Sequence, residues 1–519
     1  GMDLENDTST SPRTIQVKNS EANGNQGDGL HILASGAVTL QNLGYIGSNG
    51  QSGDGSGASI LNESGNVTIT GAAIDNPIYF NDNHDYGLYV VSNGNVAVSK
   101  IEAVNNGTMG FYVDETNLPG KTVGITNGKF NDNDSSGLEV YAKGNITLNT
   151  VEAVNNDNYG AFIDNCLQVG STGVCLGTGT ITVNAPISFT NNFNENVNDG
   201  LHIESKGNIS LTNVNANHNF DGFGAYLRNS FSGSAGTVTI TATADQFNYF
   251  SSYNAKTGLV VDSFGNISLT KVNASENNGR GAELYNDLAP TPKTVMVTNG
   301  IFNDNNNDGL YILSKGAVTL SGVMAHRDSI HDDWLDVAGI TVYEYLIEGY
   351  QTDEGWYYWT PDRWGFQATS SGGTVKISLE SDDFMPQVYV YDAEGNQVAG
   401  SDNELEENSL VIDFESEADA FYTIEVNQRW GSGGNYILSL NDLEYTNEWE
   451  PDVNGIEVDT TAGAAGVTVN NLAAVGFGVN AYDNAVDGLR IDSRGNAILN
   501  KVDSYRNGRR GLSVDLTDS

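Results

Sequence analysis

A repeated motif with a fixed spacing runs through most of this chain. Each copy has an Asn, a Gly four residues later and a second Gly seven residues after the first. Seven copies align without gaps, and their first glycines are Gly29, Gly87, Gly137, Gly200, Gly258, Gly309 and Gly488. Self-similarity at a fixed period indicates a repeat architecture in which each unit packs on its neighbours. We therefore expect most of the 519 residues to form one elongated domain.

The segments between the corner residues predict short strands. Apolar and polar residues alternate after each first Gly, as in Leu138, Glu139, Val140 and Tyr141. Successive residues of a strand face opposite sides, so the two apolar residues are expected in the core and the other two outside. A coil of 23 residues with three such segments is typical of a parallel β-solenoid. The chain has room for about 14 coils, and we expect almost no helix.

Asn and Gly at the corners are expected to be structural. Asn tolerates the left-handed αL conformation, and its amide can donate and accept hydrogen bonds along a column of identical turns. Gly provides the positive φ that a side chain disfavours. A polar residue 23 positions after each motif Asn is expected in the same column, for example Ser48 after Asn25 and Asp328 after Asn305.

The repeat resembles the right-handed parallel β-helix of the pectin-lyase-like superfamily. The resemblance covers residues 13–328 and 454–519, which carry the Asn-x-x-x-Gly corners and the alternating segments. It implies an all-β fold and supplies the right-handed sense of the coil, which spacing alone does not determine. It does not imply one activity, and the Arg-rich signatures of pectate lyases are not found in the sequence.

Residues 329–453 interrupt the repeat and differ from it in composition. All six tryptophans lie here, and runs such as TVKISLES and PQVYVYD alternate in polarity between turn residues. Such runs predict an inserted antiparallel β-sandwich. The segment GWYYWTPDRW either offers a platform for sugar stacking or packs against the protein, and packing is the simpler interpretation.

The inserted segment resembles the bacterial pre-peptidase C-terminal domain. The matching positions are Trp364, Phe366, Val375, Ile377, Leu379, Phe384, Val390, Asp392, Gly395, Tyr422, Ile424, Val426, Tyr436 and Leu438. That family is a small β-sandwich module of secreted bacterial proteins. The resemblance therefore implies export from a bacterial cell.

The charge of the chain argues against two classes of partner. The 23 Lys and Arg residues face 66 Asp and Glu residues, which gives a formal net charge of −43. Such a charge repels nucleic acid phosphates and anionic membrane surfaces. No apolar run is long enough to span a bilayer. We expect neither nucleic acid binding nor membrane insertion, and because the sequence ends within a repeat strand we expect a segment of a longer protein.

Cys166 and Cys175 flank a short loop. We expect a disulfide between them, because no nearby His or further Cys pair completes a metal site. A disulfide indicates an oxidising compartment, so the protein is expected to be extracellular or at the cell surface. His326 and His331 lack an evident third ligand, and we expect no metal site there. The acidic turns lack the full pattern of a calcium loop, which leaves Ca²⁺ binding open.

Ligand contacts must come from the outward positions of the stacked strands. In coil order, the first outward column is Tyr89, Tyr112, Glu139, Phe162, His202, Tyr226, Val260, Glu283 and Tyr311. The second outward column is Val91, Asp114, Tyr141, Asp164, Glu204, Arg228, Asp262 and Tyr285. Rings beside carboxylates suit sugar binding, although Tyr and Phe are favoured on strands in any case.

These columns give two sets of candidate site residues. The predicted ligand-binding residues are Tyr89, Tyr112, Phe162, His202 and Tyr226. The candidate catalytic residues, if the protein is an enzyme, are Asp114, Asp164, Glu204 and Arg228. Glycoside hydrolysis needs a set separation between two carboxylates, which a sequence does not give.

The sequence favours a secreted or cell-surface scaffold that acts as an adhesin or binds polysaccharide or a cell-surface glycan. No catalytic motif or cofactor site is identified. Long solenoids present extended surfaces with many weak, repeated contacts, which suits polymers. The alternative is a polysaccharide lyase or glycoside hydrolase that uses the acidic and aromatic strip. A third hypothesis is a trimeric phage-type fibre, whereas the scaffold is expected to be a monomer.

Overall fold

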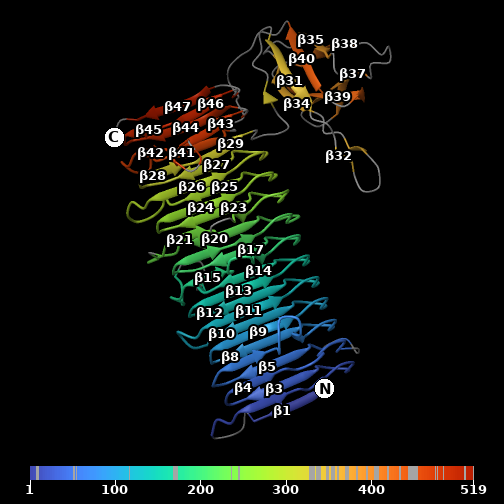
Figure 1. Cartoon of the computed structure of the whole chain (residues 1–519), viewed down its shortest axis with the longest axis vertical. Coiled ribbons are helices and arrows are strands. Elements are labelled where there is room, and N and C mark those ends of the chain that lie inside the picture. The colour runs from blue at the N-terminus through green and yellow to red at the C-terminus, as the bar shows by residue number, and fades with distance from the viewer. Residues whose placement is uncertain are drawn as a thin grey trace.

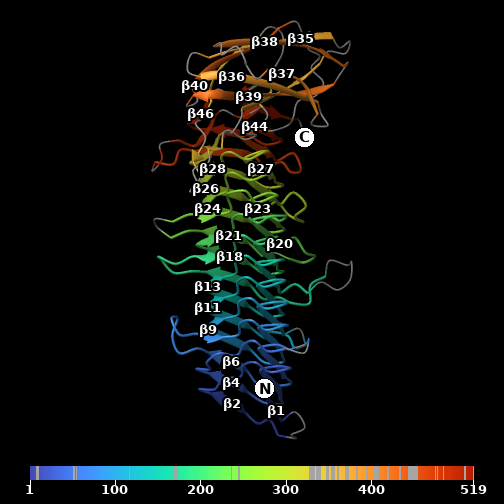
Figure 2. The same cartoon turned by 90° about the vertical axis from the view of Figure 1, so that its right-hand side faces the viewer.

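Parallel strands stack coil upon coil in both repeat regions of the computed structural model (Figures 1 and 2). The structure describes residues 1–6, 11–50, 53, 55–115, 117–167, 174–234, 236–243, 246–326, 333–334, 340–346, 350–351, 357–358, 362–368, 373–381, 384–392, 396–401, 408–417, 420–431, 434–441, 454–473, 475, 477–482, 484, 486–505, 507 and 510–517. Over these residues the chain is all-β and contains no helix. The described part therefore has no helix long and apolar enough to cross a membrane.

The first sheet has one strand per coil and contains 15 strands in parallel. They are β1 (Met2–Glu5), β3 (Leu30–Ala34), β5 (Ala58–Asn62), β8 (Leu88–Ser92), β10 (Phe111–Glu115), β12 (Leu138–Ala142), β14 (Ala161–Asp164), β17 (Leu201–Glu204), β20 (Ala225–Asn229), β23 (Leu259–Ser263), β25 (Ala282–Tyr285), β27 (Leu310–Leu313), β41 (Ile456–Asp459), β44 (Asp487–Ser493) and β47 (Arg510–Leu516). Strand β1 pairs with β3, so parallel pairing begins before residue 13, where the sequence placed the start of the repeats.

The other strands of the coils form two further faces. The second face contains β2 (Ile15–Lys18), β4 (Val38–Gln41), β6 (Val67–Thr70), β9 (Val96–Glu102), β11 (Val123–Lys129), β13 (Ile146–Glu152), β15 (Ile181–Asn184), β18 (Ile209–Thr212), β21 (Val238–Thr241), β24 (Ile267–Asn273), β26 (Val295–Ile301), β28 (Val318–Ser321), β42 (Val467–Asn470) and β45 (Ala497–Leu499). The third contains β7 (Ile78–Tyr79), β16 (Asn191–Asn192), β19 (Val214–Asn215), β22 (Asn248–Tyr249), β29 (Val323–His326), β43 (Val479–Tyr482) and β46 (Val502–Tyr505). The long strands of the second face continue into the third through a bend with positive φ, as at Thr150 (φ 55°) in β13.

Inward side chains of all three faces form one continuous core. The predicted inward pairs are buried, and Leu138 and Val140 of β12 have no exposed surface. Five phenylalanines near one corner, Phe80, Phe130, Phe193, Phe250 and Phe302, are also completely buried. Burying a side chain of this size contributes about 1.5–3 kcal/mol. The core therefore confirms the predicted parallel β-helix.

A ladder of asparagine side chains runs along one corner. Each Nδ2 donates a hydrogen bond to the Oδ1 of the next coil, for example from Asn106 to Asn133 and from Asn133 to Asn156, both at 2.9 Å. The αL conformation belongs to the residue before each ladder member, such as Asp132 with φ 55°, and not to the Asn itself as the sequence predicted. In the first coil Ser48 has that αL role, and Asn49 joins the ladder. Asp328 lies outside the described residues.

The corner glycines are required by close approach rather than by positive φ. A Cβ at Gly137 would lie 2.6 Å from the carbonyl oxygen of Phe130 and 2.8 Å from Nδ2 of Asn156. Gly137 is not among the residues with positive φ, which corrects the predicted reason for glycine here. The Asn156 amide therefore occupies its place in the ladder only because residue 137 has no side chain.

The inserted segment forms antiparallel sheets with their own core. One sheet has the order β30 (Asp333–Trp334), β34 (Asp362–Gln367), β39 (Phe421–Gly431), β36 (Phe384–Asp392) and β37 (Gln397–Ser401), in which only β30 pairs in parallel. The other has the order β31 (Ile340–Leu346), β40 (Gly434–Asn441), β35 (Gly373–Glu380) and β38 (Ser409–Ser416), and β32 (Tyr350–Gln351) pairs with β33 (Tyr357–Tyr358). Buried residues of the two larger sheets, including Phe366 and Ile377, share one cluster, as expected for a sandwich. The tryptophan side chains lie outside the described part.

Candidate functional site

The outward residues of the first sheet form straight columns. Parallel register places Tyr89 beside Tyr112, Phe162 beside His202, and His202 beside Tyr226. Glu139 of β12 lies between Tyr112 and Phe162 in the same column. We call the outward side of β8 to β20 the outer face. Its columns contain all nine candidate site residues.

Six side chains of the outer face form an aromatic ladder, defined as Tyr89, Tyr112, Tyr141, Phe162, His202 and Tyr226. Successive ring centroids are 5.2, 5.7, 5.8, 4.8 and 4.9 Å apart. Tyr141 belongs to the second outward column, and its ring bridges the coil where the first column has Glu139. The ladder is therefore continuous over six coils.

Three further rings flank the ladder, and the sequence analysis missed them. Tyr86 lies 5.1 Å from Tyr89, Tyr159 lies 5.3 Å from Phe162, and Phe223 lies 5.7 Å from Tyr226. Each of the three immediately precedes a corner glycine, at Gly87, Gly160 and Gly224. The recurrence of an aromatic residue directly before a corner glycine is a sequence signal that predicts a third outward column.

Three of the five contacts along the ladder are between stacked rings, and the two contacts of Tyr141 are tilted by 47° and 40°. The planes of Tyr89 and Tyr112 differ by 7°, and those of Phe162 and His202 by 18°. Near-parallel rings at these distances cover one another's faces. The six side chains are half-buried, so the ladder is partly exposed to solvent.

The carboxylate of Glu139 lies within the ladder. It accepts hydrogen bonds from Ser136 Oγ at 2.8 Å and from Tyr141 Oη at 2.9 Å. Burial, followed by nearby carboxylates, raises the pKa of Tyr112 to about 12 and also raises the pKa of Tyr141. These phenols therefore remain protonated donors at neutral pH.

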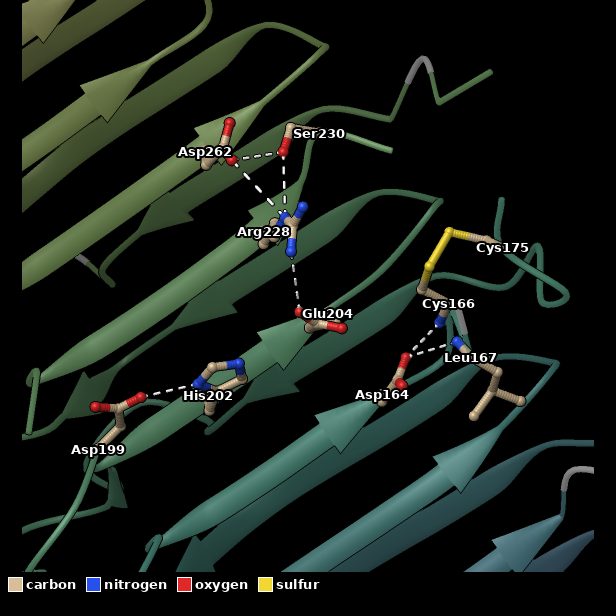
Figure 3. Close-up of polar contacts among 10 residues, drawn as sticks. All are labelled: Asp164, Cys166, Leu167, Cys175, Asp199, His202, Glu204, Arg228, Ser230 and Asp262. Atoms are coloured by element: carbon tan, nitrogen blue, oxygen red, sulfur yellow. Dashed lines mark hydrogen bonds and ion pairs between the residues drawn. A yellow bond between two sulfur atoms is a disulfide. The ribbon is translucent and has the colours of Figure 1, made fainter. Parts of the chain in front are cut away.

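His202 is held between two rings and one carboxylate, and Figure 3 shows its contact with the carboxylate of Asp199. Its Nδ1 lies 2.8 Å from Oδ2 of Asp199, whose Oδ1 accepts the backbone N–H of Phe223 at 2.9 Å. The imidazole stacks on Phe162 at 4.8 Å and on Tyr226 at 4.9 Å. The arrangement fixes the orientation of the ring.

Arg228 joins two carboxylates on the edge of the outer face (Figure 3). Its guanidinium lies 3.5 Å from Glu204 and 3.8 Å from Asp262, and Asp262 also accepts a hydrogen bond of 2.5 Å from Ser230 Oγ. The guanidinium lies 4.6 Å from the ring centroid of Phe231. Two of the candidate catalytic residues, Glu204 and Arg228, are therefore an ion pair.

Asp164 caps the turn that leads into the cysteine loop (Figure 3). Its Oδ1 accepts the backbone N–H groups of Cys166 at 2.7 Å and Leu167 at 2.8 Å. Cys166 and Cys175 form a disulfide. Asp164 is 9% exposed, and burial raises its pKa to about 6 although the two N–H groups oppose the shift. This carboxyl has a structural role at the turn.

The four candidate catalytic residues do not all come together. Asp164 pairs in register with Glu204, and Glu204 with Arg228. Asp114 pairs with Tyr141, which separates it from Asp164 by one whole coil. Strands one coil apart are about 4.8 Å apart, so Asp114 lies about 10 Å from Asp164 and farther still from Glu204 and Arg228.

A second polar cluster lies on the same sheet, closer to the insertion. Arg280 Nε donates to Oδ2 of the fully buried Asp308 at 2.7 Å, and its guanidinium lies 4.1 Å from the ring centroid of Tyr311. Glu283 accepts a hydrogen bond of 2.5 Å from Tyr285 Oη and lies 3.5 Å from Arg280. These charges satisfy one another, which indicates a structural cluster.

Within the described part of the chain, one group of side chains at an end of the solenoid has the spacing of metal ligands. Ligand atoms of Asp3, Glu5 and His31 lie within 4.8 Å of one another, and His31 Nδ1 is 2.9 Å from Asp3. Exposed acidic groups of this kind are common without an ion. His326 lies 3.9 Å from Asp304 and stacks on Tyr482, while His331 lies outside the described residues.

Comparisons with known proteins agree with the architecture. The family model described as the right-handed β-helix region matches residues 5–166. No curated protein matches the chain. The family match agrees with the parallel coils of the structure, which form a right-handed β-helix interrupted by an antiparallel sandwich.

Solved structures similar to the chain fall into two groups. The pre-peptidase C-terminal domain of a collagenase from Bacillus anthracis is 17% identical with a TM-score of 0.17, over 21% of this chain and 95% of that one. The tailspike protein gp49 of Acinetobacter baumannii bacteriophage Fri1, a capsular polysaccharide depolymerase, is 9% identical with a TM-score of 0.26, over 79% and 80%. The enzymatically active domain of bacteriophage CBA120 tailspike protein 4 is 8% identical with a TM-score of 0.17, over 79% of this chain and 64% of that one.

Proposed function

We propose that the protein is a secreted or cell-surface scaffold that binds polysaccharide along its outer face. The observation that carries this proposal is the continuous aromatic ladder, which has one ring per coil and four tyrosine hydroxyls on a face that also has carboxylates. Phenol hydroxyls donate hydrogen bonds and carboxylates accept them, so together they can bind sugar hydroxyls, which do both. A rigid surface with such groups at intervals of about 4.8 Å suits an extended polymer.

The disulfide supports the proposed location. Cys166 and Cys175 are bonded, and disulfides persist mainly in oxidising compartments. A scaffold outside the cell would meet polysaccharides of cell surfaces. We also propose that the scaffold is adhesive and acts as a monomer, which light scattering tests.

Binding to a glycan array, followed by affinity measurements on the best ligand, tests the proposal. The key variant is Tyr89→Phe with Tyr112→Phe, which removes two hydroxyls and keeps both rings in the ladder. We expect its affinity to fall about tenfold, because each lost hydrogen bond contributes about 0.5–1.5 kcal/mol. Tyr249→Phe, at an exposed tyrosine of β22 outside the outer face, is the matched control. An unchanged affinity in the double variant would count against the hydroxyl contacts.

Glycoside hydrolysis is a second candidate, favoured by the pairing of Asp164 with Glu204. The two residues are paired in register on neighbouring strands about 4.8 Å apart, which allows their carboxyls to reach the roughly 5–5.5 Å separation of retaining glycosidases. Burial raises the pKa of Asp164 to about 6, which suits an acid, and Glu204 lies 3.5 Å from the guanidinium of Arg228. The wild type should release reducing ends from a polysaccharide, and Glu204→Gln should abolish this release. No release of reducing ends from neutral or acidic polysaccharides would exclude glycoside hydrolysis.

A further inference from the structure

We propose that the outer face selects polysaccharides without acidic groups. This inference rests on the proposed function and specifies the chemical class of its ligand. The charges around the aromatic ladder carry it, because they decide which polymer can approach the hydroxyls and ring edges.

Carboxylates surround the ladder along its whole length. Asp114, Asp164 and Glu204 stand in register in the second outward column, Glu139 contacts Tyr141 at 2.9 Å, and Asp199 contacts His202 at 2.8 Å. With Asp85 and Asp262 they make seven carboxylates, and the charge of each also raises the pKa of at least one tyrosine of the outer face. A ligand lying on the ladder therefore approaches several of them at once.

The cations that contact this face do not offset that charge. Arg228 is already shared between Glu204 and Asp262, so it adds little attraction for an outside anion. Lys256 Nζ lies 5.4 Å from the ring centroid of Phe223, at one end of the ladder. Among the contacts of the described residues, two cations thus face seven carboxylates, and the balance is negative.

Ring edges and phenol hydroxyls act in the opposite direction. Both carry partial positive charge and attract anions. Partial charges are smaller than the full charges of carboxylates, so repulsion dominates for an acidic polymer. One like-charged pair at about 5 Å in water weakens binding roughly fourfold. Two or three such pairs along a bound segment give at least about tenfold discrimination, which salt reduces.

The test uses pairs of polysaccharides that share a backbone and differ in charge. Suitable pairs are hydroxyethyl cellulose with carboxymethyl cellulose, methyl-esterified pectin with polygalacturonate, and dextran with dextran sulfate. We expect the uncharged member of the bound pair to bind at least about tenfold more tightly at 20 mM salt, with a smaller ratio at 0.5 M salt. If the acidic member binds equally or more tightly, and this binding is lost in Tyr89→Phe with Tyr112→Phe, the selectivity is wrong. The proposed function then still holds, because the ligand binds at the outer face. No binding to any pair or to the glycan array would overturn both.

A charge variant tests the cause. Asp114→Asn with Asp262→Asn removes two of the seven charges with little change in shape and releases Arg228 from one partner. The matched control is Asp75→Asn with Asp503→Asn, at exposed positions away from the outer face. We expect the preference for the uncharged polymer to fall at least about threefold in the first variant and to stay the same in the control. An unchanged preference in the first variant would overturn the electrostatic explanation.

Discussion

Asp308 Oδ1 accepts a hydrogen bond of 2.6 Å from the backbone N–H of Asn454, 146 positions later in the chain. Asp308 precedes the insertion, and Asn454 is the first described residue after it. Strand β27 also pairs directly with β41, and β28 with β42. The solenoid therefore continues across the insertion with its coil register unbroken.

Removal of the inserted segment should leave the solenoid intact. Deletion of residues 331–453 restores the four-residue corner spacing between position 328 and Gly455. Because the flanking coils already pair, we expect a soluble protein with an unchanged β-sheet circular dichroism signal per residue and wild-type polysaccharide affinity. Aggregation of the shortened chain would show that the sandwich is needed for folding. Loss of affinity alone would place part of the binding site in the sandwich.

Arg280→Met should destabilise the solenoid strongly. The substitution leaves the fully buried Asp308 without its 2.7 Å partner. Breaking a buried ion pair from one side costs about 3–5 kcal/mol. Urea unfolding should show this loss, and Arg280→Met with Asp308→Asn should recover part of it because no unpaired charge remains. Equal stability of the single variant and the wild type would contradict the structural role of the pair.

Glu115 makes the stability of the coil depend on pH. Its side chain is fully buried, and burial raises its pKa to about 8, with Asp114 adding to the shift and Lys121 opposing it. A raised pKa means that the folded state favours the protonated acid. The contribution of Glu115 therefore favours folding below about pH 4.5 and is lost as the pH rises towards 8.

Glu115→Gln should remove this dependence. Relative to the wild type, we expect the variant to gain about 2 kcal/mol or more of unfolding free energy between pH 5 and pH 9. Urea unfolding at both pH values measures the difference, and Glu63→Gln on an exposed turn is the control. A gain that is the same at both pH values would show that Glu115 does not titrate in this range.

Sequence periodicity predicted the outward columns correctly because parallel strands of equal register repeat the same alternation in every coil. The αL position was misplaced by one residue, since Asn and Asp occupy both that position and the ladder, as in Asp132 and Asn133. The stacking of the ladder rings depends on side-chain torsions, which the sequence pattern does not give. The turn role of Asp164 depends on the path of the cysteine loop, which is set by tertiary structure.

Polysaccharide binding by Phe162→Ala with Tyr226→Ala tests the central claim most directly. These two rings lie on either side of His202 at 4.8 and 4.9 Å, so their loss interrupts the ladder at its most closely packed point. Tyr249→Ala is the control, and unfolding curves establish that each variant is folded. We predict that the double variant binds the best glycan ligand at least about tenfold more weakly than the wild type, with no change in the control. Wild-type affinity in a folded double variant would contradict the assignment of the outer face as the binding surface.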